Sequence, residues 1–163
     1  MVHLVTADLR LLDAALAGDD ALAEALGHAV VPGWVTFPGA LSHALDAAAA
    51  DSRAPEWGTR FFVAGDPPEL VGWGGYKGPP GDSGVVEVGY EIAESRQGRG
   101  VATAAVDAML DHAFSQPGVT AAIAHTLTEH NASTRVLEKA GFSHDAVTEE
   151  DGQRVWRWRR ERS

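Results

Sequence analysis

A glycine-rich loop between a strand-like and a helix-like segment constrains this fold more than any other feature. Residues 95–103 read SRQGRGVAT, directly after VVEVGYEI (85–92) and directly before AAVDAMLDHAF (104–114). Such a turn leaves main-chain N–H groups unpaired at a helix N-terminus, where the helix dipole also favours an anion. The pattern therefore predicts a phosphate-binding loop. An ordinary strand-to-helix turn with solvated arginines is the alternative.

The residue types in the loop suit a phosphate. Gly98 and Gly100 permit unusual backbone dihedrals and a close approach of the main chain, and Ala102 is too small to block it. Arg96 and Arg99 add charge that can meet phosphate oxygens.

Two other phosphate-binding motifs do not match. A Walker loop needs a lysine after its second glycine, and the only nearby lysines are Lys77 and Lys139. A dinucleotide fingerprint needs a third glycine where Thr103 stands, and an acidic residue about twenty positions later, whereas VTAAIAHT (119–126) has no carboxylate. A Rossmann domain is therefore not favoured.

Periodicity elsewhere predicts alternating strands and helices. We expect strands within 5–13, 59–65, 69–78, 84–92, 119–126, 143–147 and 153–159, and helices within 18–30, 40–52, 104–114 and 131–142. Asp19 or Asp20 is expected to cap the first helix, and Asn131 or Ser133 the last. This order indicates an α/β fold of mixed α+β type with a mixed sheet, and 163 residues indicate a single domain over 1–163.

Composition excludes several classes of function. Residues 1–153 hold eight basic and twenty-two acidic groups, a balance of −14 that opposes binding to nucleic acid. The chain has no apolar run near the roughly 18 residues of a membrane helix and no secretory leader, so we expect a cytoplasmic protein without a membrane partner. Of seven histidines only His125 and His130 lie close together, without a third ligand nearby, which predicts no metal.

The motifs together resemble a known family. VGYEIAESRQGRGVATAAVDAML (88–110), followed by NASTRVLEKAGF (131–142), is similar to the GNAT superfamily of acetyl-CoA-dependent N-acetyltransferases. Residues 97–102 fit its Gln/Arg-x-x-Gly-x-Gly/Ala pyrophosphate loop, and residues 133–142 resemble the branch that contains RimJ and RimL. The resemblance covers about residues 61–158. It does not extend to the first sixty residues, where such enzymes shape the substrate pocket.

This resemblance implies a splayed mixed sheet with acetyl-CoA between the strand ending at Ile92 and the strand ending near Thr126. The main chain of residues 88–93 would face the pantetheine arm. The implied coenzyme contacts are Ile92, Gln97, Gly98, Arg99, Gly100, Val101, Ala102, Thr103 and Asn131. The branch often places its asparagine three residues before the serine, a position that His130 occupies here.

Catalysis requires a neutral amine and a stabilised thiolate. Glu87 resembles the mid-strand glutamate that many relatives use as a base, often through a water. Glu91, on the same strand face, is the alternative base or an anchor for the substrate ammonium. Ser133 is the hydroxyl at the start of the last helix, where many relatives have a tyrosine, and it is expected to hydrogen-bond the thiolate, to cap the helix, or both.

The expected function is direct transfer of an acetyl group from acetyl-CoA to a primary amine, either a protein N-terminal α-amine or a small-molecule amine. A catalytically inactive coenzyme A sensor or scaffold is the alternative, and a nucleotide-binding regulatory domain is a third interpretation. Trp156 and Trp158 are expected on one sheet face, for packing or for a homodimer contact. Trp34, Trp57 and Trp73 belong either to the core or to a substrate pocket.

Overall fold

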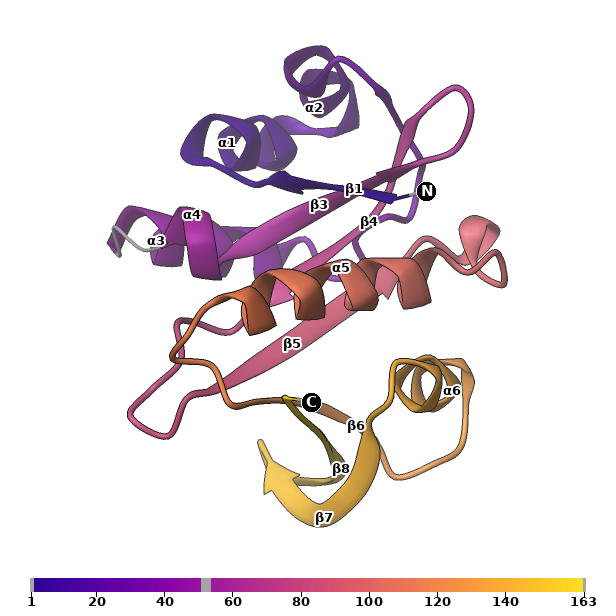
Figure 1. The fold of residues 1–163 in the computed structure, drawn as a ribbon. Coiled ribbons are helices and arrows are strands. Elements are labelled where there is room, and N and C mark those ends of the chain that lie inside the picture. The colour runs from indigo at the N-terminus through magenta and orange to yellow at the C-terminus, as the bar shows by residue number, and fades with distance from the viewer. Residues whose placement is uncertain (1, 51–53, 163) are drawn as a thin grey trace.

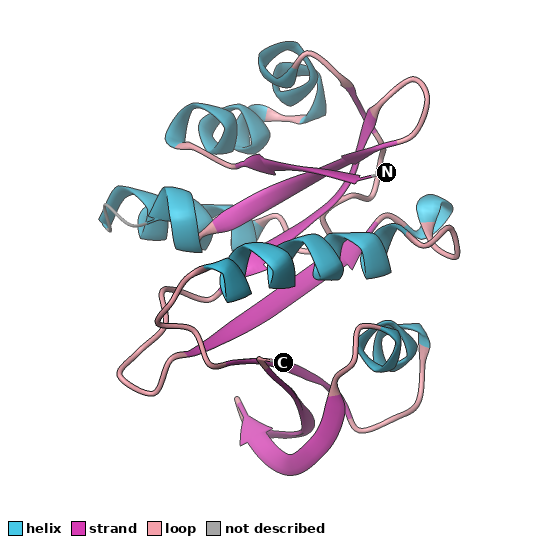
Figure 2. Ribbon diagram, viewed as in Figure 1, coloured by secondary structure: helices cyan, strands magenta, loops and turns pink. Residues whose placement is uncertain are grey.

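The computed structural model describes residues 2–50 and 54–162 as an open mixed sheet with helices on both faces (Figures 1 and 2). The strands are β1 (Val2–Thr6), β2 (Ala29–Val30), β3 (Thr59–Ala64), β4 (Glu69–Tyr76), β5 (Val85–Ile92), β6 (Ala121–Leu127), β7 (Ser143–Glu150) and β8 (Gln153–Glu161). The helices are α1 (Leu9–Ala17), α2 (Asp19–Leu26), α3 (Gly39–Ala50), α4 (Ala54–Trp57), α5 (Val101–Ser115) and α6 (Ala132–Lys139), with a 3-10 turn at Glu94–Arg96. The predicted α/β mixed-sheet class is confirmed.

The sheet opens at its middle. Its order is β1-β3-β4-β5-β6-β8-β7, with β2 paired to β4, and β5 and β6 form the parallel pair at the centre. That pair joins only residues 85–87 to residues 121–123, so the remaining lengths of β5 and β6 diverge. Figure 1 shows α5 over β5 on one side of the opening and α6 beyond β6 on the other. The splayed sheet expected from the resemblance is therefore present.

Successive side chains of the central strands point alternately into two separate hydrophobic cores, one on each face of the sheet. In β3, Phe61 packs with α1 and α3, whereas its neighbour Phe62 packs on the face covered by α5. In α5, the apolar residues at helical spacing are buried against that second face: Ala105, Val106, Met109, Leu110 and Ala113. Both faces of β3 and β4 thus contribute to a core, whereas β5 contributes its buried residues to the core under α5.

Near the N-terminus, two predictions are wrong. A strand was expected within 5–13, but β1 ends at Thr6 and α1 begins at Leu9, because the Asp8 carboxylate accepts from the Leu11 N–H and caps a helix. Helix α2 has Gly18, not an aspartate, as its N-cap, and the two aspartates lie in its first turn. In the helix predicted over 40–52, residues 51 and 52 lie outside the described residues.

The C-terminal elements agree with expectation. Asn131 caps α6 in a capping box with Thr134, so the alternative that Ser133 is the cap is wrong. The two indoles of β8 lie 6.2 Å apart on one face, and the buried Trp158 donates from Nε1 to Thr126 Oγ1, which is sheet packing. Among the helices of the described residues, none has the length and apolar character that crossing a membrane requires.

Candidate active site

The loop before α5 has the geometry that an anion requires. Gly98 and Gly100 have φ of 76° and 77°, in the left-handed region that favours glycine. Gly100 is the N-cap of α5, no side chain caps that helix, and its first turn contains no acidic residue. The N–H groups at the start of α5 are therefore free of side-chain competitors and of repelling charge.

A cavity of about 430 Å³ opens onto this helix terminus. It lies between the end of β5, the N-terminal turn of α5 and α6. The predicted residues that line it are Glu91, Ile92, Arg96, Gln97, Gly98, Gly100, Val101, Ala102, Thr103 and Ser133. Three other predicted residues are not in this lining: Glu87, the exposed Arg99, and Asn131.

Several polar side chains at or near the cavity already have partners. Arg96 forms an ion pair with Glu69 at 3.2 Å, and Gln97 Nε2 donates to the Ile92 carbonyl at 3.0 Å, which ties the loop to the end of β5. The Asn131 amide oxygen accepts from the Thr134 N–H at 3.1 Å, so that side chain serves the helix cap.

Sequence reasoning missed the cations of α6. Arg135 and Lys139 lie four residues apart on this helix and both line the cavity. Their i, i+4 spacing is the signal that could have indicated a shared basic face.

A second, shallower groove of about 300 Å³ meets the first. Its lining consists of Thr59, Trp73, Gly74, Gly75, Tyr76, Lys77, Gly89, Tyr90 and Glu91. Tyr90 and Glu91 line both spaces. Three of these residues are glycines, and a Cβ added at Gly89 would come no nearer than 3.9 Å to the Lys77 side chain, so the floor of the groove is open at that residue.

Glu91 is held at this junction by two donors from distant parts of the chain. Its Oε1 accepts from the Thr36 N–H at 2.6 Å and from Trp73 Nε1 at 2.9 Å. Both bonds go to the same oxygen, which orients the carboxylate, and among the described residues no hydrogen bond to Oε2 is found.

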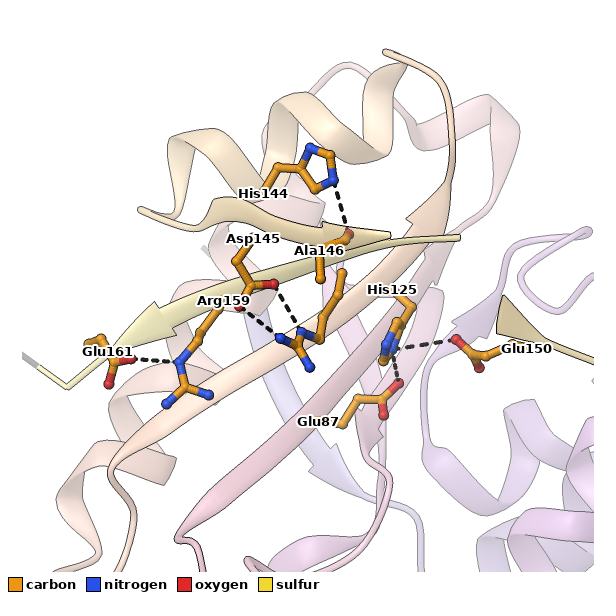
Figure 3. A network of polar contacts seen from close by, with 9 residues as sticks. Glu87, His125, His144, Asp145, Ala146, Glu150, Arg159 and Glu161 are labelled. Carbon is orange, nitrogen blue, oxygen red and sulfur yellow. Dashed lines mark hydrogen bonds and ion pairs between the residues drawn. The ribbon is translucent and has the colours of Figure 1, made fainter. Parts of the chain in front are cut away.

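Glu87 occupies a different position, further back along β5. Its Oε2 lies 2.8 Å from Lys77 Nζ and 2.9 Å from His125 Nδ1, as Figure 3 shows for the histidine. Burial raises the pKa of Glu87, but the hydrogen bonds and charges of Lys77 and His125 outweigh burial, so that its pKa lies below the ordinary value. Glu87 is therefore ionised at neutral pH.

The surroundings of His125 differ from the sequence prediction. Glu87 and Glu150 lie beside its ring, and the ligand atoms of these three residues all lie within 4.8 Å of one another. The expectation that no third metal ligand is near His125 was therefore wrong, because β5, β6 and β7 bring residues together that are far apart in sequence. Lys77 places its positive charge beside the same Glu87 oxygen. The absence of a metal stays a prediction.

Tyr90 is the functional candidate that sequence reasoning overlooked. Its hydroxyl lies 3.0 Å from both the main-chain oxygen and the Oγ of Ser133. Helix α6 itself contains no tyrosine, as the sequence shows, but the Tyr90 hydroxyl reaches its first turn from β5.

Comparison with known proteins decides the family. A model of the acetyltransferase (GNAT) domain matches residues 2–143. The chain belongs to this GNAT family. YjdG of Bacillus subtilis (strain 168), named an uncharacterized N-acetyltransferase, is 27% identical over 143 residues, which are 86% of this chain and 85% of YjdG.

Two solved structures share the GNAT fold. The aminoglycoside acetyltransferase AAC(6′)-Ib in complex with coenzyme A is 18% identical, with a TM-score of 0.68 over 99% of this chain and 95% of that chain. RimL, a ribosomal alpha-N-protein acetyltransferase in complex with coenzyme A, is 16% identical, with a TM-score of 0.69 over 98% and 93%. This GNAT protein is an N-acetyltransferase, as expected, whereas membership of the RimJ and RimL branch remains a prediction.

Proposed function

We propose that this GNAT protein transfers an acetyl group from acetyl-CoA directly to a primary amine. One observation carries the proposal: the uncapped N-terminus of α5, preceded by two left-handed glycines, opens into a cavity between diverging strands. A diphosphate fits this terminus by charge and by hydrogen bonding.

The coenzyme would be held by the residues that line the cavity. The loop from Gln97 to Thr103 would bind the pyrophosphate, and the pantetheine arm would follow the main chain of β5 toward Tyr90. Arg135 and Lys139 give the α6 side of the cavity a positive charge that suits the 3′-phosphate of coenzyme A. AAC(6′)-Ib and RimL, which share the fold, were both solved with coenzyme A. Coenzyme contacts by Arg99 and Asn131 remain predictions, because neither residue lines the cavity.

The acceptor would enter through the glycine-floored groove and meet the thioester where the two spaces join. There the amine nitrogen attacks the carbonyl carbon, and the carbon–sulfur bond breaks to release the coenzyme thiolate. We assign the proton of the amine to Glu87, acting through a water because it lies outside the coenzyme cavity. Glu91, oriented at the junction, would anchor the incoming ammonium. Proximity of the two substrates would supply much of the rate.

The pKa of the acceptor amine determines how strong a catalytic base the reaction needs. At pH 7, keeping a lysine-like amine neutral costs roughly 4.6 kcal/mol, whereas a protein α-amine costs only about 1 to 1.4 kcal/mol. The lowered pKa of Glu87 makes it a weak base, which favours an acceptor of low basicity. A protein N-terminal α-amine, or a small-molecule amine of similar pKa, fits this requirement.

Incubation with acetyl-CoA and a panel of amines tests the proposal. We expect thiol release that depends on the amine, together with an acetyl mass increment on one acceptor. Binding of coenzyme A without thiol release from any amine would instead indicate an inactive sensor or scaffold. Competition by ATP or NAD at low concentration would indicate a nucleotide-binding regulatory domain.

A further inference from the structure

The coenzyme cavity and the acceptor groove meet at two consecutive residues of β5. Tyr90 and Glu91 line both spaces, and successive side chains of a strand leave on opposite faces. Tyr90 shares its face with the buried Val88 and packs against the core under α5, whereas Glu91 contacts Trp73 and Thr36. The reacting atoms must lie at this junction, so both faces of the strand can contribute a side chain to them.

The Tyr90 side chain spans the opening of the sheet. Its ring begins on β5, and its hydroxyl reaches Ser133 on the first turn of α6, with both Ser133 oxygens at 3.0 Å. Ser133 also lines the coenzyme cavity. The hydroxyl is therefore placed at the part of the cavity where β5 faces α6, beside any thioester that lies along the β5 main chain.

We infer that Tyr90 donates the hydrogen bond that stabilises the departing coenzyme thiolate, and that Ser133 is the positioning residue that orients the Tyr90 hydroxyl. This inference rests on the proposed acetyl transfer. The sequence analysis expected Ser133 itself to hydrogen-bond the thiolate, whereas here the Tyr90 hydroxyl is the group that contacts the sulfur.

The orientation follows from the number of donors and acceptors. Each hydroxyl has one proton, and the Tyr90–Ser133 contact can be donated from either side. When Ser133 Oγ–H donates to the Tyr90 oxygen, the Tyr90 proton is free to turn from the Ser133 carbonyl to the sulfur. A hydrogen-bond chain of this kind strengthens its terminal donor.

The chemistry calls for a hydrogen bond rather than a proton transfer. Burial raises the pKa of Tyr90 more than the Ser133 hydrogen bond lowers it, so the phenol stays neutral and remains a donor. An ordinary phenol has a pKa of about 10 and an ordinary thiol about 8.5, so the thiolate is too weak a base to take this proton. In the balanced step the amine loses one proton through water to Glu87, the sulfur leaves as thiolate, and the free thiolate is protonated by solvent.

Tyr90→Phe tests the inference, with saturating acceptor and acetyl-CoA. Removing one preorganised donor from a developing anion lowers kcat by about 10²- to 10³-fold. We expect the Kd of acetyl-CoA to stay within about twofold, since the thioester sulfur carries no charge. Ser133→Ala should lower kcat less than Tyr90→Phe, and Ser133→Thr, which restores a hydroxyl, should recover it. An unchanged kcat in Tyr90→Phe, with intact thermal unfolding, would overturn the inference.

A second measurement separates a catalytic donor from a structural one and does not require turnover. The ultraviolet absorbance of the thiolate reports the pKa of coenzyme A bound to the protein, and we expect it to lie below that of free coenzyme A. Arg135 and Lys139 also line the cavity, so the difference between the unaltered protein and Tyr90→Phe isolates the hydroxyl. A bound thiol pKa that is not lowered in the unaltered protein overturns the inference even if Tyr90→Phe fails to fold. Thiol release by the unaltered protein tests the proposed function separately.

Discussion

The Glu87 carboxylate and the His125 imidazole meet at 2.9 Å where β5 and β6 separate. Glu87 is in the last residue pair that joins the two strands, opposite Ile123, and His125 lies two residues further along β6. The contact therefore closes the base of the opening into which the coenzyme is proposed to fit. Together with the Lys77 ammonium, it also keeps Glu87 ionised.

This arrangement makes stability depend on pH in the acidic range. Because the pKa of Glu87 is lower in the folded than in the unfolded chain, its ionisation adds stability above the unfolded value of about 4.3 and loses it as the pH falls through the folded pKa. Denaturant unfolding at pH 7, 4 and 3 should show Glu87→Gln less stable than the unaltered protein at pH 7, with a difference that narrows as the pH falls below about 4.3. A difference that does not narrow between pH 4 and pH 3 would contradict the assignment.

Glu87 and Glu91 should differ in the kinetic constant that they control. Glu87→Gln removes the proposed base and should lower kcat by about 10²- to 10⁴-fold, with little change in acetyl-CoA affinity. Glu91→Gln removes a charged hydrogen-bond acceptor for the ammonium, worth about 1.5–3 kcal/mol, so the KM of the amine should rise by about 10- to 100-fold. Steady-state kinetics on both variants checks this, and the reverse pattern would exchange the two roles.

Ala102 should control coenzyme binding through charge as well as size. Ala102→Glu places a carboxylate beside the proposed pyrophosphate site and should abolish detectable binding of coenzyme A by calorimetry. Ala102→Gln has nearly the same volume without the charge and should bind measurably. Equal affinities of the two variants would mean that no anion lies at this helix terminus.

Replacing Arg135 should weaken the binding of coenzyme A more than the binding of dephospho-coenzyme A, which lacks the 3′-phosphate. Loss of one charged contact to phosphate, about 1.5–3 kcal/mol, should weaken coenzyme A about 10- to 100-fold in Arg135→Ala and leave the dephosphorylated form nearly unaffected. Arg154→Ala, an exposed arginine at the start of β8, is the matched control. A similar loss for both ligands would place the 3′-phosphate away from α6.

Local patterns were sufficient for much of the fold. The apolar stripe of α5, the Asn131 cap of α6 and the β7–β8 hairpin all follow from residues within a few positions of one another. The prediction of a strand within 5–13 was wrong. Helix α1 forms there because Asp8 caps it and because Leu11 and Leu12 are buried, and the apolar pattern of the segment indicated neither.

By itself the sequence determined the conformation of the glycine loop before α5, because glycine conformation and helix-terminal N–H groups are properties of consecutive residues. Tertiary structure alone decided what surrounds that loop. Tyr90 reaches Ser133 across 43 positions, Thr36 reaches Glu91 across 55, and His125 reaches Glu87 across 38. Such contacts arise from strand register and from the angle at which β5 and β6 separate, and these depend on the packing of both cores rather than on any local pattern.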